Sequence, residues 1–147
     1  MKKTILIICL ILGGCDFFTG TKIDNNPDSL AKYLGVKLPA SATGINAQII
    51  SGANDHLVQL IARFEIGKDD LGRFAENLKL IRTNNPNASV SALPLLGDKS
   101  TVPWWNPPET LDQWKMQDRF LREYGDGHKI SLIWVNGNAY LYKSGPY

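Results

Sequence analysis

The sequence predicts an α+β domain: a small antiparallel sheet of about four strands, arranged as two hairpins, with one or two helices packed on one face. Three observations lead to this prediction. Apolar and polar residues alternate from His56 to Ile66, as in a strand with one buried side. Asn136-Gly137, a strong hairpin signal, lies between two strand-like runs. Apolar residues recur at helical spacing over residues 68 to 81, between the two hairpins.

The first predicted element is a short helix over residues 27 to 34. Asn26 is a favourable N-cap, and Pro27 suits the first helical position. Leu30 and Leu34 fall on one helical face. Gly35 follows at the position where glycine commonly ends a helix.

The first hairpin is expected to begin with a strand from about Ile45 to Ser51. Residues 52 to 55, Gly-Ala-Asn-Asp, have the composition of a turn. The alternating run that starts at His56 then pairs with the first strand. Its apolar side comprises Val58, Leu60, Ala62, Phe64 and Ile66.

The helix predicted over residues 68 to 81 begins with Asp69 and Asp70, where negative charge suits a helix N-terminus. Gly72 within it costs about 1 kcal/mol relative to alanine. We expect this helix to pack on the sheet through one apolar face. That face comprises Leu71, Phe74, Ala75, Leu78 and Ile81.

Periodicity stops from Arg82 to Glu109, a stretch that holds five of the eight prolines. Connections of this length in a small domain are commonly functional or partly disordered. The next stretch, Leu111 to Tyr124, fits a helix and also fits a strand. We favour the helix.

The second hairpin is expected from the runs Ile130 to Val135 and Asn138 to Tyr142. With Asn136-Gly137 as a two-residue turn, the register is determined. Three cross-strand pairs then follow, namely Leu132 with Leu141, Trp134 with Ala139, and Ile133 with Tyr140.

The chain begins with a pattern typical of export. Lys2 and Lys3 precede an apolar run from Ile5 to Leu12, which is too short for a bilayer-spanning helix of roughly 20 residues. The run ends in Leu12-Gly13-Gly14-Cys15. This segment resembles the signal peptide of bacterial lipoproteins, and the last four residues match its lipobox. The alternative is a plain secretory signal in which the cysteine occurs by chance.

The resemblance implies diacylglyceryl transfer to the sulfur of Cys15, cleavage between Gly14 and Cys15, and acylation of the new amino terminus. Two or more acyl chains make a stable membrane anchor. We therefore expect a signal peptide at residues 1 to 14, a lipidated tether at 15 to 25 and a single α+β domain at 26 to 147. The domain would face the periplasm or the exterior. Asp16 resembles the mark for inner-membrane retention in enterobacterial lipoproteins.

Composition restricts the function further. Lys2 and Lys3 leave with the signal, so the 16 basic residues fall to 14, equal to the 14 acidic residues. A neutral domain lacks the positive charge on which nucleic-acid binding depends. Cys9 also leaves and Cys15 would carry lipid, so the domain has no cysteine for disulfides, thiol catalysis or metal ligation. We expect no metal and no cofactor.

The best candidate binding surface is the proline-flanked segment that contains Trp104 and Trp105, together with Tyr140 and Tyr142. Tryptophans held in a stiff loop could form an aromatic platform for a sugar, a peptide or a protein partner. The alternative is that these rings cover the open face of the sheet, over Ile133, Tyr140 and Tyr142.

No catalytic constellation emerges from the sequence. His56 and His128 are the two histidines, and neither lies in a metal-binding spacing. A triad of Ser131 or Ser144 with His128 and Asp126 can be written, but no nucleophile elbow accompanies it. We expect a non-enzymatic, lipid-anchored envelope protein that binds an envelope or cell-wall partner. The alternatives are a periplasmic immunity lipoprotein directed against a toxin and a cell-wall hydrolase.

Overall fold

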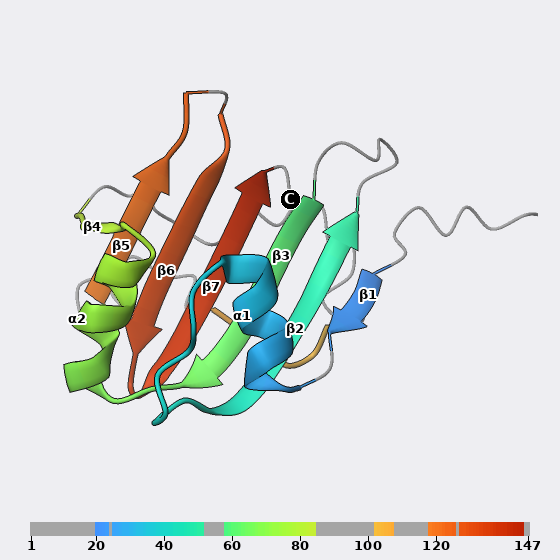
Figure 1. The fold of residues 1–147 in the computed structure, drawn as a ribbon, viewed down its shortest axis with the longest axis horizontal. Helices are drawn as coiled ribbons and strands as arrows, with labels where there is room; N and C mark the ends of the chain where they lie inside the picture. The colour runs from blue at the N-terminus through green and yellow to red at the C-terminus, as the bar shows by residue number, and fades with distance from the viewer. Residues whose placement is uncertain are drawn as a thin grey trace, which may run out of the picture.

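The computed structural model is an antiparallel sheet with two helices, which confirms the α+β class (Figure 1). Seven strands lie in the order β1-β2-β3-β7-β6-β5-β4, and every neighbouring pair is antiparallel. The sheet is therefore larger than the four strands predicted. The structure describes residues 20–23, 25–51, 58–84, 102–107, 118–125 and 127–145.

The additional strands are β1, β4 and β5, and they lie at the two sides of the sheet. The first four elements are β1 (Gly20–Ile23), α1 (Pro27–Leu34), β2 (Thr43–Ser51) and β3 (Val58–Glu65). The remaining elements are α2 (Lys68–Asn77), β4 (Ile81–Arg82), β5 (Asp118–Glu123), β6 (Lys129–Val135) and β7 (Asn138–Gly145).

Strand β1 lies within the stretch that the sequence analysis assigned to a tether. It pairs with β2 from Gly20 opposite Ile50 to Ile23 opposite Ala47. The side chain of Ile23 is buried in the core beneath the helices. Four residues are too few to display the alternation that identifies a strand, and the folded domain begins earlier in the chain than predicted.

Helix α1 has the predicted bounds, because both of its ends are specified locally. The side-chain oxygen of Asn26 accepts a hydrogen bond from the backbone N–H of Asp28 at 2.9 Å. At the other end Gly35 adopts φ 72°, and its N–H donates to the carbonyl of Ala31. Leu30 and Leu34 are the buried residues of the helix.

The β2–β3 hairpin is confirmed, with Ala47 opposite Ala62 and Ile49 opposite Leu60. Strand β2 starts two residues earlier than predicted. Its register shifts between Thr43 and Asn46, where Gly44 adopts φ 58°. This local irregularity fits a glycine, because a positive φ is costly for other residues.

Helix α2 is confirmed but ends at Asn77 and not at residue 81. Lys79 takes a left-handed conformation with φ 57°, and the chain then enters β4. There Ile81 pairs with Leu121 of β5 and is 74% exposed. Pairing with a strand distant in sequence thus replaces the last helical turn that the apolar spacing predicted.

Residues 118–123, for which a helix was favoured, form strand β5, so that prediction was wrong. Phe120 pairs with Leu132 of β6, and Leu121 pairs with Ser131. Both sides of β5 are covered, since Arg119, Phe120 and Leu121 are all buried. A strand buried on both sides shows no alternation, and its pattern resembles that of a helix. Residues 111–117 of the predicted helix lie outside the described residues.

The β6–β7 hairpin has the predicted register: Leu132 lies opposite Leu141, and Ile133 lies opposite Tyr140. Asn136 and Gly137 form the turn with φ 49° and 84°. Positive φ at both positions matches the right-handed twist of the flanking strands.

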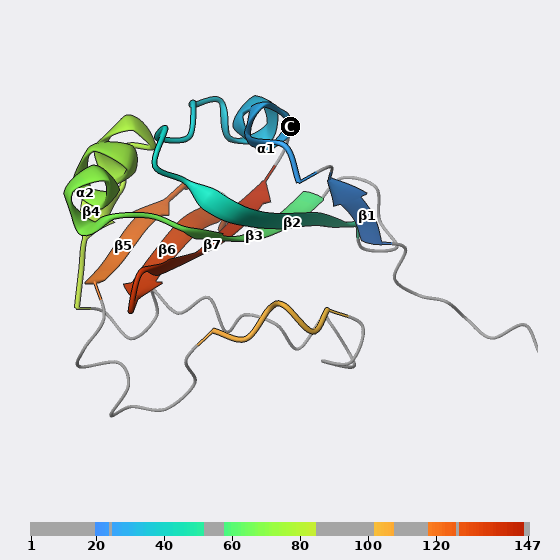
Figure 2. The ribbon, with the colours of Figure 1, turned by 90° about the horizontal axis from the view of Figure 1, so that it is seen from below.

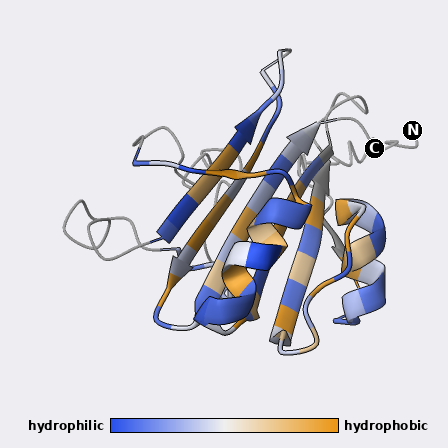
Figure 3. Ribbon diagram, turned by 60° about the vertical axis from the view of Figure 1, so that its left-hand side comes forward, coloured by the Kyte–Doolittle hydropathy of each residue, from blue (hydrophilic) through white to orange (hydrophobic). Residues whose placement is uncertain are grey.

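The two faces of the sheet are covered differently (Figure 2). Helices α1 and α2 pack on one face over the larger core, which includes Ala62, Phe64, Phe74, Leu132 and Leu141. Hydrophobic and hydrophilic residues alternate along the strands in Figure 3. Residues 102–107 run below the opposite face, which we name the loop-covered face. Its buried cluster comprises Ile61, Val102, Trp105, Ile133, Tyr140 and Tyr142.

Neither described helix has the length and hydropathy needed to cross a bilayer.

Candidate functional site

The predicted aromatic residues all lie on the loop-covered face, but most of them are buried. Trp105 is 6% exposed, and its ring meets the ring of Tyr140 edge-on at 5.8 Å between centroids. Tyr140 and Tyr142 are buried in the same cluster. Trp105 thus covers the sheet, as the second of the two interpretations stated, and Trp105, Tyr140 and Tyr142 do not form an exposed platform. Trp104 is the one partly exposed member.

Arg63 of β3 fastens the loop to the sheet. Its guanidinium donates to Oδ1 of Asn138 at 3.0 and 3.2 Å, to the carbonyl of Trp104 at 3.3 Å and to Oδ1 of Asn106 at 3.3 Å. The hydroxyl of Tyr140 donates to the same Asn106 oxygen at 3.2 Å. The guanidinium also lies 5.6 Å from the centroid of the Tyr140 ring, a cation–π distance. One cationic side chain therefore joins loop and sheet through neutral acceptors.

Buried polar groups are concentrated on this face. Ser131 is 0% exposed and Arg119 is 8% exposed, and these two are the buried polar or charged residues among those that the structure describes. Their strand partners, Tyr142 and Ile133, belong to the loop-covered cluster. Burial lowers the pKa of Arg119 from its ordinary value, because a desolvated guanidinium is less stable in its charged form.

Three buried side-chain atoms of the described residues have no hydrogen-bond partner: Oε1 of Gln59, Nε1 of Trp105 and Oγ of Ser131. Gln59 is two residues from Ile61 on β3, so all three residues lie on the loop-covered face. An unpaired buried polar atom costs about 1–3 kcal/mol. Among the described residues, no side chain on the helix-covered face has a buried polar atom without a hydrogen-bond partner. The loop-covered face therefore differs from an ordinary core, in which nearly every buried polar atom has a hydrogen-bond partner.

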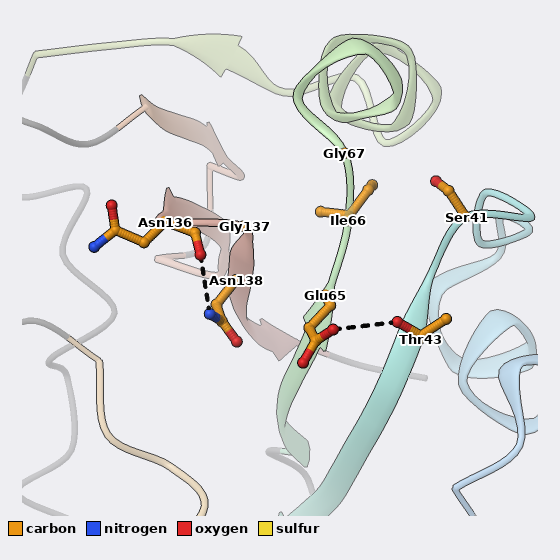
Figure 4. A pocket seen from close by; sticks show the side chains of 8 residues that line it. All are labelled: Ser41, Thr43, Glu65, Ile66, Gly67, Asn136, Gly137 and Asn138. Atoms are coloured by element: carbon orange, nitrogen blue, oxygen red, sulfur yellow. Dashed lines mark hydrogen bonds between the residues drawn. The ribbon is translucent and has the colours of Figure 1, made fainter.

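An open pocket of about 390 Å³ lies where β3 ends and where β2 and β7 begin (Figure 4). The N–H of Ile66 donates to the carbonyl of Gly137 at 2.9 Å and ties the exit of β3 to the hairpin turn. Asn138 donates its amide N–H to the carbonyl of Asn136 at 3.3 Å. The lining residues are Ser41, Thr43, Glu65, Ile66, Gly67, Asn136, Gly137 and Asn138.

The residues of the hypothetical triad are not assembled by the part of the chain that is described. Oγ of Ser131 has no hydrogen-bond partner, and Oγ of Ser144 accepts from the backbone N–H of Lys129 at 3.1 Å. His128 packs beside Gly145, at the end of β7 away from the pocket. Asp126 and His56 lie outside the described residues.

The remaining predicted residues are placed as follows. Asp70 accepts a hydrogen bond from the hydroxyl of Ser41, and its carboxylate lies 3.6 Å from the guanidinium of Arg73. Gly14, Cys15 and Asp16 lie outside the described residues. No group of three or more His, Cys, Asp or Glu side chains suited to a metal ion occurs in the described ranges.

Sequence reasoning missed Arg63, Asn106 and Asn138. Arg63 lies on the same side of β3 as Ile61. One sequence signal could have identified Arg63, because it is a cationic residue on the side of the strand opposite the predicted apolar side. Its partners in the loop are 41 and 43 residues away, a separation at which spacing carries no information.

In three comparisons, with protein-family models, with curated proteins and with solved structures, the chain has no significant match.

Proposed function

We propose that the protein is a lipid-anchored component of a bacterial envelope, and that it is a non-enzymatic module that binds a partner through its loop-covered face. The anchor rests on the lipobox resemblance and on the Cys15 sulfur that it identifies. The binding face rests on one observation: the unpaired buried side-chain atoms of the described residues all belong to one face of the sheet, the loop-covered face.

This observation favours binding for a physical reason. Cores that serve only stability pair their buried polar groups, whereas departures from this rule collect at functional sites. Gln59, Trp105 and Ser131 all depart from it on one face of one sheet. A partner that displaces or penetrates the loop could supply the missing hydrogen bonds. Trp104, which is partly exposed beside this cluster, would make the first contact.

The anchor is tested by detergent phase partitioning of the full chain and of Cys15→Ser. The wild type should enter the detergent phase and the variant should remain in the aqueous phase. Equal partitioning would refute the anchor. Mass analysis of the mature amino terminus provides the matched check, because a lipidated Cys15 adds the mass of its acyl chains.

The binding face is tested by affinity capture from solubilised envelopes with the wild type, Trp104→Ala and Glu76→Ala. Glu76 is exposed on α2, on the opposite side of the sheet. We expect Trp104→Ala to lose a partner that both the wild type and Glu76→Ala retain. If Glu76→Ala loses it and Trp104→Ala retains it, the helix side binds and the proposal is wrong.

A further inference from the structure

The pocket at the ends of β2, β3 and β7 has a chemical bias. The hydroxyl of Ser41 donates to Oδ2 of Asp70, and the hydroxyl of Thr43 donates to Oε2 of Glu65 at 3.4 Å. The Asn138 amide donates to the carbonyl of Asn136. Both hydroxyl protons and one of the two Asn138 amide N–H groups are thus used within the protein. Hydroxyl and carboxylate oxygens retain further lone pairs, so the pocket offers mainly acceptors.

Glu65 supplies negative charge to this set of acceptors. Its carboxylate has no ion-pair partner in the described ranges, where the ion pairs involve Asp70 and Asp118. Arg63, two residues earlier, directs its donors to Asn138, Trp104 and Asn106 and not to Glu65.

Two other cationic residues, Lys68 and Arg73, also have partners other than Glu65. Lys68 follows Gly67 directly, but its ammonium lies 3.9 Å from Asp118 and 5.8 Å from the centroid of the Trp134 ring. Arg73 lies 3.6 Å from Asp70, the carboxylate that holds Ser41. No described cation of this chain is therefore paired with Glu65.

We propose that this pocket binds a cationic hydrogen-bond donor, an ammonium or guanidinium group, with Glu65 as its counter-charge. The Thr43 hydroxyl, which lies beside the Glu65 carboxylate in Figure 4, supplies a further acceptor oxygen, and Ser41 lines the pocket on the side of α2. The buried side chain of Ile66 forms an apolar part of the lining. The pocket borders the loop-covered face through Asn138, which accepts from Arg63, but it does not include Trp104 or Trp105, and the inference stands without the proposed function.

The test is titration of the isotope-labelled, full mature chain in detergent micelles, followed by backbone amide NMR. The probes are an N-acetylated, C-amidated Gly-Lys-Gly peptide and ethanolamine. We expect saturable shifts at the amides of Gly67, Gly137 and Asn138. The same peptide with its lysine ammonium acetylated should produce none, because acetylation removes the charge.

A variant that removes the charge of Glu65 and a matched control make the test decisive. Glu65→Gln should weaken binding by about fivefold, the magnitude of one ion pair near a surface. Glu76→Gln, outside the pocket, should leave the affinity unchanged.

Each outcome is informative. Shifts with the peptide alone identify a protein side chain as the ligand, and equal affinity for ethanolamine identifies a small free amine. Equal binding of the acetylated and charged peptides would overturn the proposal. So would a Glu65→Gln protein that keeps its native amide spectrum and also keeps wild-type affinity.

Discussion

Replacing Ser131 by alanine should stabilise the protein, although most substitutions of buried residues destabilise. Ser131 is 0% exposed, and its Oγ has no hydrogen-bond partner. In the unfolded chain water bonds this hydroxyl, so folding costs about 1–3 kcal/mol of unrecovered desolvation. Alanine removes the hydroxyl and leaves a void smaller than a methyl group, at a cost below about 1 kcal/mol. The net gain should be about 1 kcal/mol in the free energy of unfolding.

Urea unfolding of the full mature chain measures this gain. With a slope of about 2 kcal/mol per molar urea, the midpoint should rise by about 0.5 M. Ser144→Ala is the matched control, because Oγ of Ser144 accepts from the N–H of Lys129 at 3.1 Å. Losing that bond should destabilise by about 0.5–1.5 kcal/mol. If Ser131→Ala destabilises as much as Ser144→Ala, the Ser131 hydroxyl has a partner, and only two of the three buried atoms on the loop-covered face are unpaired.

Three further predictions concern stability. Trp105→Ala should lower the free energy of unfolding by about 3–5 kcal/mol in urea, and partly exposed Trp104→Ala by about 1 kcal/mol or less; equal losses would contradict the described packing. Burial raises the pKa of Tyr142, so the folded protein keeps the phenolic proton where the unfolded chain has lost it. Stability should therefore fall as pH rises above about 10, and thermal unfolding against pH should show a smaller fall in Tyr142→Phe. Gly72→Ala should raise the melting temperature by stabilising α2 by about 1 kcal/mol, since a Cβ there meets no atom within 4 Å; a lower melting temperature would show a steric conflict.

The sequence predicted correctly the elements that are specified by residues close to them in the chain. Helix α1 follows from its cap residue Asn26 and from Gly35, and the β6–β7 register follows from Asn136-Gly137. Strand β5 could not be predicted in this way, because burial on both sides removes the alternation by which a strand is recognised. Helix α2 is shorter than its apolar spacing predicted, because Ile81 pairs with Leu121, 40 residues later, and belongs to β4.

The candidate site was predicted only in part, because some of its residues are adjacent in the sequence and others meet only in the folded sheet. The sequence drew attention to Trp104 and Trp105, because two adjacent tryptophans among prolines are unusual. Which ring is buried depends on contacts with Tyr140 and Arg63, which are distant in the chain. The pocket around Glu65 depends on three strand ends that meet only in the folded sheet.

Site-specific photocrosslinking in intact envelopes tests directly whether the protein binds a partner through its loop-covered face. A photoreactive phenylalanine analogue replaces Trp104 in one protein and Glu76 in another, so that the two faces of the sheet are compared in the same membrane. If the partner binds the loop-covered face, position 104 should yield a discrete crosslinked product that position 76 does not yield. The same product from both positions, or a product from position 76 alone, would contradict it.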